Sequence, residues 1–230
     1  MRNEYGVIVV GGGHAGTEAA AASARAGVRT LLLSPDLTRI GQMSCNPAVG
    51  GVAKGVVARE VDALGGVMGQ ATDASRIQFR MLNRSKGPAV WGPRAQCDRA
   101  MYPVVVRRIL DGLPMLDLFQ DMVDDLVVDS GRAVGVRTRG GLVFQGQSVV
   151  VTTGTFLRGR IHVGGESGVE AGRAGEAPSV ALAEGLEGLG LEVARFKTGT
   201  PPRVDGRTVD FSKTERQDGD DLLYRFAAYA

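Results

Sequence analysis

The chain has 230 residues, 43% of them hydrophobic, and a formal net charge of +2, a composition that suits one globular domain or most of a larger one. No apolar run approaches the ~20 residues of a membrane helix, and a strand-like segment follows Met1 too closely for a signal peptide, so we expect a cytoplasmic protein without membrane segments. Cys45, Cys97 and the two histidines have neither the number nor the spacing of a disulfide framework or a metal site.

The chain opens with the pattern of a buried strand, a glycine turn and a helix. Residues 5–10 are apolar, residues 11–16 read Gly-Gly-Gly-His-Ala-Gly, and an alanine-rich stretch follows to residue 26. A second apolar run over residues 28–33 completes the spacing of a βαβ unit. This context predicts a dinucleotide-binding turn.

Each glycine of the turn has a physical role in that prediction. Gly11 permits the bend, Gly13 lets the backbone approach a pyrophosphate, and Gly16 lets the helix pack closely on the strand. The free N–H groups of the helix start can then face phosphate oxygens. The alternative is a strand-to-helix turn that binds nothing.

The end of the second strand leaves the identity of the dinucleotide open. The acid that usually binds the ribose is displaced, since the strand ends in Ser34 and Asp36 lies slightly late. Either Ser34 bonds a ribose hydroxyl or Asp36 caps the next turn. A motif this close to the N-terminus, followed by long insertions, is commoner in FAD proteins than in nicotinamide dehydrogenases.

Cys45 lies in the segment that follows the βαβ unit. Asn46 and Pro47 are interpreted as the cap and first residue of a helix that ends before Gly65-Gly66. This interpretation places the Cys45 thiol beside a helix start.

The next segment is strongly basic. Residues 76–108 contain seven arginines and one lysine against the single acid Asp98, whereas residues 111–129 carry six aspartates and no base. Arg76, Arg80 and Arg84 share one face if this stretch is helical. The basic segment could bind RNA phosphates or be an ordinary solvated surface, and an aromatic content of 5% offers few stacking platforms.

The following elements are a helix over residues 98–113, closed by Pro114, and three short strands separated by glycine turns. The strands are expected at residues 122–128, 133–138 and 142–144, as a small antiparallel meander.

A buried strand over residues 148–155 is expected to return to the parallel sheet and bring Gly154 near the nucleotide. Residues 182–189 have helical spacing, and residues 197–230 are expected to be mostly irregular.

This order of elements predicts an α/β fold: a Rossmann-like FAD-binding domain of the glutathione-reductase type, with a small antiparallel β-meander and insertions. The late strand and glycine turn that close the flavin pocket of such domains are missing, so we expect the N-terminal portion of a longer protein. Its parts are the βαβ unit at 1–36, an insertion with Cys45 and the basic segment at 37–113, the meander and returning strand at 114–160, and the remainder at 161–230.

Several long strings carry a resemblance to a known family. They are GGGHAGTEAA at 11–20, IGQMSCNPAVGGVAKG at 40–55, IQFRMLNRSKGPAV at 77–90, RAQCDRAMY at 94–102, TGTFLRGRIHVG at 153–164 and KTGTPPR at 197–203. Together they closely resemble the MnmG (GidA) family of tRNA uridine 5-carboxymethylaminomethyl modification enzymes, over essentially the whole chain.

The resemblance implies an FAD enzyme that acts with the GTPase MnmE on the wobble uridine of certain tRNAs. Methylene-tetrahydrofolate, NADH, and glycine or ammonium are the implied co-substrates, and a homodimer is the implied assembly. The product carries a carboxymethylaminomethyl or aminomethyl group at C5 of the uracil.

Carried over position by position, the resemblance assigns a set of FAD-binding residues and one catalytic residue, Cys45. The FAD set is Gly11, Gly12, Gly13, His14, Ala15, Gly16, Val123 and Ser179.

A cysteine suits the implied chemistry because C5 of uracil is a poor nucleophile until a group adds to C6. A thiolate of Cys45 at C6 would make C5 an enolate carbon able to attack a methylene group. The helix start at Pro47, with Lys54 and Arg59 nearby, is expected to favour the thiolate. The alternative is that Cys45 is a small hydrophobe in a turn.

Other residues of the resembling strings have less specific interpretations. Lys86, Arg94 and Lys197 face either RNA or the phosphates of a cofactor, while Cys97, usually alanine in the family, and His162 are interpreted as packing residues. The family's second cysteine is absent, so we expect this chain alone to be inactive.

Two other functions stay open. One is a folate- and FAD-dependent tRNA uridine methyltransferase of the TrmFO type, against which the MSCNPAVGG and KTGTPPR strings argue. The other is a truncated, noncatalytic remnant of a flavin domain.

Overall fold

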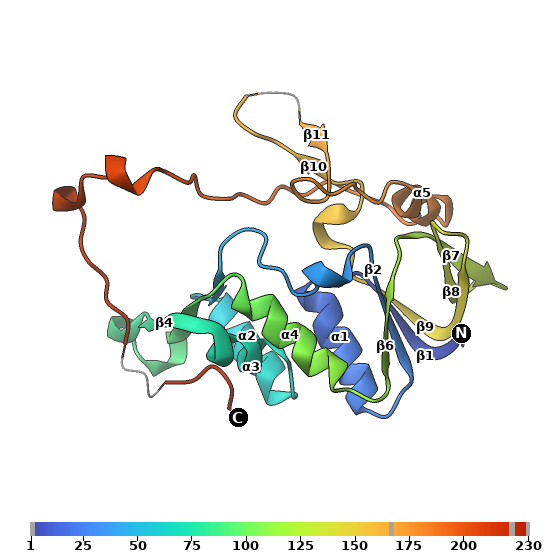
Figure 1. Ribbon diagram of the computed structural model, residues 1–230, viewed down its shortest axis with the longest axis horizontal. Helices are drawn as coiled ribbons and strands as arrows, with labels where there is room; N and C mark the ends of the chain where they lie inside the picture. Colours follow the sequence, from blue (N-terminus) through green and yellow to red (C-terminus); the bar gives the residue numbers. More distant parts are fainter. Residues whose placement is uncertain (1–2, 166–167, 221–223, 229–230) are drawn as a thin grey trace.

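The structure is a computed structural model that describes residues 3–165, 168–220 and 224–228. Its main layer is a six-stranded sheet with the order β6-β2-β1-β9-β8-β7 (Figure 1). Strands β6, β2, β1 and β9 pair with one another in parallel, whereas β8 pairs antiparallel with both β9 and β7. Their bounds are β1 Glu4–Val10, β2 Thr30–Ser34, β6 Leu116–Gln120, β7 Val123–Asp129, β8 Arg132–Thr138 and β9 Val143–Val151.

The predicted βαβ unit is confirmed. Strand β1 runs parallel to β2, with Val7 opposite Thr30 and Val10 opposite Leu33, and helix α1 (His14–Arg25) connects them. All residues of β2 are buried, as expected for an inner strand of a parallel sheet. The ends of both strands are thereby fixed beside the turn at residues 11–13.

Strand β9 combines two of the predicted elements. Its first half closes the antiparallel meander, with Gln145 opposite Gly135, and its second half returns to the parallel sheet, with Val151 opposite Val10. The sequence predicted two separate strands here, at residues 142–144 and 148–155, because the polar residues 145–147 between them resemble a loop. Strand β6, which lies within the acidic segment of residues 111–129, was not predicted.

A second layer lies beside α1 and contains the three-stranded sheet β3-β5-β4 with helices α2, α3 and α4 (Figure 1). The predicted helix start at Pro47 is wrong, because residues 48–50 form a strand and Gly50 and Gly51 have φ of +87° and +132°. The bounds are β3 Ala48–Gly50, α2 Lys54–Ala63, α3 Met68–Ser75, β4 Arg76–Leu82, β5 Gly92–Cys97 and α4 Met101–Asp111.

The other helix predictions have mixed outcomes. The stop at Gly65 is confirmed by its φ of +86°, and the helix near residues 98–113 is α4, which Asp98 caps by accepting hydrogen bonds from Ala100 N and Met101 N. The prediction that a helix places Arg76, Arg80 and Arg84 on one face is wrong, since residues 76–82 form β4. In the part of the chain that is described, no helix is long and apolar enough to cross a bilayer.

A third group of short elements lies above the sheet (Figure 1). The predicted helix at residues 182–189 is confirmed as α5 (Ala181–Gly188), which packs on β7. Cys97 is buried, as predicted, and burial raises the pKa of its thiol, but His162 is exposed and does not pack in a core. The remaining elements are β10 Arg160–Ile161, β11 Val169–Glu170 and 3₁₀ turns at Leu37–Arg39, Arg84–Lys86, Pro88–Val90, Gly154–Phe156, Gly206–Thr208 and Phe211–Lys213.

The C-terminal segment is irregular in backbone, as expected, but anchored at its end. From α5 it runs across the top of the molecule to the region of β4 and turns back (Figure 1). Phe226 is fully buried against Phe79, with ring centroids 5.8 Å apart. The carboxylate of Asp73 accepts hydrogen bonds from Phe226 N and Ala227 N, each 2.9 Å long.

Replacing Phe226 by alanine is expected to lower the free energy of unfolding by about 3–5 kcal/mol, because it removes a fully buried aromatic ring. The matched control is Phe211→Ala, whose ring is 69% exposed and whose loss should change stability by less than about 0.5 kcal/mol. Urea denaturation followed by fluorescence checks both values. Equal stability of the two variants would show that the tail is not anchored.

Candidate functional site

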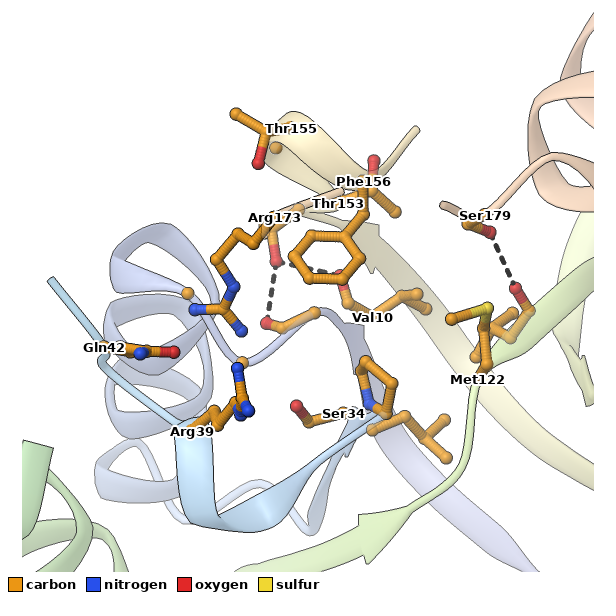
Figure 2. Close-up of a pocket in the computed structure, with 18 of the residues that line it drawn as sticks. Val10, Ser34, Arg39, Gln42, Met122, Thr153, Thr155, Phe156, Arg173 and Ser179 are labelled. Carbon is orange, nitrogen blue, oxygen red and sulfur yellow. Dashed lines mark hydrogen bonds between the residues drawn. The ribbon is translucent and has the colours of Figure 1, made fainter. Parts of the chain in front are cut away.

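A cavity of about 210 Å³ opens at the carboxyl ends of β1, β2 and β9, where parallel sheets of this type bind ligands. It is smaller than the roughly 300–1,000 Å³ of sites that enclose a whole small ligand, so it can hold only part of a dinucleotide. Figure 2 shows polar side chains from several segments around it. The lining residues are Val10–His14, Leu33–Pro35, Arg39, Gln42, Ser44, Asp121–Val123, Thr152–Phe156, Arg173 and Ser179.

The glycine turn has the geometry that its sequence predicts. A Cβ at Gly16 would lie 1.8 Å from the carbonyl oxygen of Gly11, and one at Gly11, whose φ is +110°, would lie 2.6 Å from that of Thr152. A Cβ at Gly13 would meet nothing within 4 Å, so this backbone is open to a ligand. Gly11 and Gly16 therefore allow close packing, and Gly13 allows close approach.

The start of α1 can bind an anion. Its N-cap is Gly13, which supplies no side-chain cap, and its first turn holds no acidic residue. The backbone N–H groups at this end consequently carry the positive end of the helix dipole toward the cavity.

The structure brings most of the predicted cofactor residues together. Gly11 to His14 line one side of the cavity and Val123 and Ser179 line the other, where the Ser179 hydroxyl donates to the Val123 carbonyl oxygen at 3.3 Å (Figure 2). Gly154 lines the same cavity, as the returning strand predicted. Ala15 and Gly16 do not belong to its lining: Ala15 is exposed and Gly16 is packed against Gly11.

The hydrogen bonds of Asp36 decide between the two interpretations of the end of β2, a ribose contact by Ser34 or a cap by Asp36. Its carboxylate accepts from Thr38 N at 2.8 Å and from Thr38 Oγ1 at 2.6 Å, and the pKa of Asp36 is lowered, chiefly by Thr38. Asp36 is thus a cap, and Ser34 is the polar side chain of this strand end that lines the cavity.

Sequence reasoning missed two arginines that line the cavity. Arg39 Nη1 lies 3.0 Å from one carboxylate oxygen of Glu176, and Arg173 Nε lies 2.7 Å from the same oxygen (Figure 2 labels both arginines). Glu176 holds both guanidinium groups at the cavity, where their positive charge favours an anionic ligand. Arg173 lies six residues before Ser179, in the string GRAGEAPS at residues 172–179, whereas nothing local in the sequence marks Arg39.

Gln42 also lines the cavity and was not predicted. Its side-chain oxygen is buried and accepts no hydrogen bond within the described part of the protein. A buried acceptor without a partner is costly, so a ligand donor at this position would be favoured.

His14 is held in an environment that disfavours its charged form. Burial lowers the pKa of the imidazole below its ordinary value, and the positive charge of Arg173 lowers it further. Its ring lies 5.6 Å from that of Tyr102. His14 is therefore a neutral hydrogen-bonding group beside the helix start at neutral pH.

Cys45 follows Ser44, which lines the cavity, and is partly exposed. Its Sγ lies 3.3 Å from Thr200 Oγ1, and Arg203 Nη2 donates to its carbonyl oxygen at 2.6 Å. The expected stabilisation of a thiolate by a helix start at Pro47 is therefore wrong, because β3 follows Pro47 and the next helix begins only at Lys54.

The described hydrogen bonds of Cys45 do not involve Lys54 or Arg59, the cations expected near it. Arg59 donates to the carbonyl oxygen of Arg225, in the C-terminal segment, and the described contacts of Cys45 come instead from the KTGTPPR segment.

The basic segment does not form one exposed face. Arg84 makes an ion pair of 3.0 Å with Asp220, and Arg76 makes one of 3.4 Å with Asp73 while it also donates to the carbonyl oxygen of Tyr224. These two arginines hold the C-terminal segment.

The chain is similar to a group of related proteins. The family model described as "Glucose inhibited division protein A" matches residues 6–229. The tRNA uridine 5-carboxymethylaminomethyl modification enzyme MnmG of Thermodesulfovibrio yellowstonii is 54% identical over 218 residues, which are 95% of this chain and 35% of that protein. The chain thus spans about a third of the length of this relative.

Solved structures agree with this similarity. The structure of Aquifex aeolicus GidA has a TM-score of 0.92 and 47% identity over 99% of this chain and 38% of that one. The GidA-related protein of Thermus thermophilus has a TM-score of 0.59 and 29% identity over 81% of this chain and 68% of that one.

The glycine geometry predicts losses of stability of different size for two substitutions. Gly16→Ala places a methyl group against the Gly11 carbonyl and should lower the free energy of unfolding by about 1–3 kcal/mol. Gly13→Ala meets open space and should cost less than about 1 kcal/mol, mainly through the weaker N-cap. Thermal unfolding of both variants is the measurement, and an equal loss in both would contradict the packing role of Gly16.

The environment of His14 predicts a pH dependence of stability. Because its pKa is lower in the folded than in the unfolded chain, the unfolded chain binds more protons as the pH falls below about 6.5, and the free energy of unfolding decreases. His14→Gln should remove this part of the dependence, whereas His162→Gln, at an exposed position, should retain it. Denaturant titrations from pH 7.5 downward compare them, and parallel curves for all three proteins would refute the assignment.

Proposed function

Because this chain belongs to the glucose-inhibited division protein A family, we propose that it forms the dinucleotide-binding part of an FAD-dependent enzyme that modifies tRNA. The reaction adds a carboxymethylaminomethyl or aminomethyl group at C5 of the wobble uridine. The observation that carries the proposal is the convergence of the glycine turn, Val123 and Ser179 on one cavity, with Ser44-Cys45 at its edge.

The residues present fit the diphosphate of FAD. The open backbone at Gly13 and the uncapped start of α1 suit phosphate oxygens, with His14 beside them, and Arg39 and Arg173 add positive charge. Gly12, Ala15 and Gly16 complete this turn, while Val123 and Ser179 would contact the cofactor from the opposite wall. The unpartnered oxygen of Gln42 suits a ligand N–H or O–H donor. FAD supplies redox chemistry when it is bound.

Cys45 is the nucleophile in this proposal. Its thiolate adds to C6 of the uracil, which makes C5 an enolate carbon that attacks the methylene carbon of methylene-tetrahydrofolate. A C5–CH2 bond forms, the bonds from that carbon to the folate nitrogens break, and the amine of glycine or ammonium takes the place of the folate on it. Loss of the C5 proton and departure of the Cys45 thiolate then restore the ring. Thr200 supports this role because its hydroxyl lies 3.3 Å from the sulfur and can hold the side chain in place.

The remaining components belong to the intact protein. We assign it NADH as reductant, the GTPase MnmE as partner, tRNA as substrate and a homodimeric state. This chain corresponds to 35% of its relative from Thermodesulfovibrio, and the second cysteine expected of the family is not in its sequence. By itself the chain should therefore lack modification activity.

Cys45→Ser in the intact protein should abolish formation of the modified uridine but leave flavin content unchanged, because Cys45 acts on the uracil and does not line the cavity. Cys97→Ala, at a buried position 52 residues further along the chain, is the control and should keep both properties. Absorbance spectra of the purified proteins and mass spectrometry of tRNA nucleosides measure them. Normal levels of modified uridine in the Cys45 variant would refute the mechanism.

Gly13→Ala tests the cofactor site separately, since a methyl group at this open position blocks the approach of a phosphate. Its dissociation constant for FAD, measured by titrating FAD into the intact protein freed of flavin, should rise at least about tenfold, which corresponds to about 1.4 kcal/mol of binding free energy, while its stability is retained. A dissociation constant equal to that of the unsubstituted protein would contradict the placement of FAD.

A further inference from the structure

Three arginines from distant parts of the chain converge on the dipeptide Ser44-Cys45. Arg99 Nη2 donates to the Ser44 carbonyl oxygen at 3.2 Å, Arg173 Nη1 donates to the Ser44 hydroxyl at 3.3 Å, and Arg203 Nη2 donates to the Cys45 carbonyl oxygen at 2.6 Å. Each guanidinium bonds a different atom. The dipeptide that carries the thiol is thus surrounded by positive charge.

The three arginines differ in how their charge is compensated. Arg173 is paired with Glu176 and faces the cavity. Arg99 and Arg203 are exposed, and among the residues that the structure describes no acidic side chain forms an ion pair with either. Asp98, the sequence neighbour of Arg99, is occupied as the cap of α4.

Both exposed guanidinium groups keep donors for a further partner. An arginine side chain has five N–H groups in a planar fork, and a single contact to a carbonyl oxygen uses one of them. That contact also restricts the long side chain, so less conformational entropy is lost when an anion binds. Two restrained cations that have no acidic partner among the described residues, beside a partly exposed thiol, form a binding site for anionic groups of a substrate.

We propose that Arg99 and Arg203 bind phosphodiester groups of the RNA next to the uridine that reaches Cys45. This inference rests on the proposed function and adds the residues that position its substrate. Unpaired RNA loops, whose bases can be turned out, are the usual targets of sequence-specific recognition, and arginine contacts to their phosphates place the base. Arg99 belongs to the basic segment of residues 76–108 and Arg203 lies outside it, whereas Arg76 and Arg84 of that segment hold the C-terminal segment.

The proposal is tested by the salt dependence of RNA binding to the intact protein. The probe is a fluorescently labelled anticodon stem-loop RNA, and anisotropy titrations at several KCl concentrations give the slope of log K against log salt. Arg99→Ala and Arg203→Ala should each weaken binding about 5–10-fold and reduce the magnitude of the slope by about 0.7, the value for one phosphate contact on a single strand. Arg132→Ala, at the exposed first residue of β8, should change neither quantity.

Lysine variants separate phosphate binding from a purely structural role. If the arginines only hold the Ser44-Cys45 backbone, lysine and alanine variants should both leave the slope unchanged. If they bind phosphates, Arg99→Lys and Arg203→Lys should restore most of the slope, because the charge is kept. If Arg99→Ala and Arg203→Ala give the same salt slope as the unsubstituted protein and the Arg132→Ala control, the proposal is overturned.

The outcome is distinguishable from a failure of the proposed function. Altered salt slopes together with normal uridine modification by Cys45→Ser would support the RNA contacts and refute the nucleophile. Unaltered slopes together with loss of modification in Cys45→Ser would refute the RNA contacts and leave the proposed chemistry intact.

Discussion

The packing of α1 against the end of β1 is the constraint on which the site depends. A Cβ at Gly16 would lie 1.8 Å from the Gly11 carbonyl oxygen, so the helix can start this close to the strand only with glycine there. The Thr152 hydroxyl, 2.9 Å from the Val10 carbonyl oxygen and 3.1 Å from that of Gly11, ties the end of β9 to the same turn (Figure 2). The ends of β1 and β9 and the N-terminus of α1 are thereby brought together at the cavity.

Charge around the cavity is organised by contacts between segments far apart in the sequence. Glu176 joins Arg39 and Arg173, residues 134 positions apart, and orients both toward the cavity. Glu176 is shared by the two guanidinium groups, and Arg39 Nε also pairs with Asp36 at 3.2 Å, so both arginines are held at the cavity, which they line with N–H donors. Together with the uncapped start of α1, this arrangement explains why one end of the sheet suits an anionic ligand.

The C-terminal segment connects the two layers of the molecule and the surroundings of Cys45. Its residues Thr200 and Arg203 contact Cys45, and further along Phe226 fills the core between α3 and β4. Two of the three arginines whose spacing suggested a helical RNA-binding face instead hold this segment. Arg76, at the start of β4, donates to the Tyr224 carbonyl oxygen, and Arg84, in the 3₁₀ turn after β4, pairs with Asp220. The same amino acids therefore have a structural role that composition alone does not reveal.

The sequence by itself determined the βαβ unit, the helices at residues 101–111 and 181–188 and the glycine turn, because short-range periodicity and the lack of a side chain at glycine act locally. Val123 and Ser179 were assigned through resemblance, and both line the cavity. Only the tertiary structure decided that residues 48–50 form a strand, that Asp36 is a cap and that three arginines surround Ser44-Cys45. Strand pairing and ion pairs between distant segments depend on which residues the fold brings together, and no local pattern carries that information.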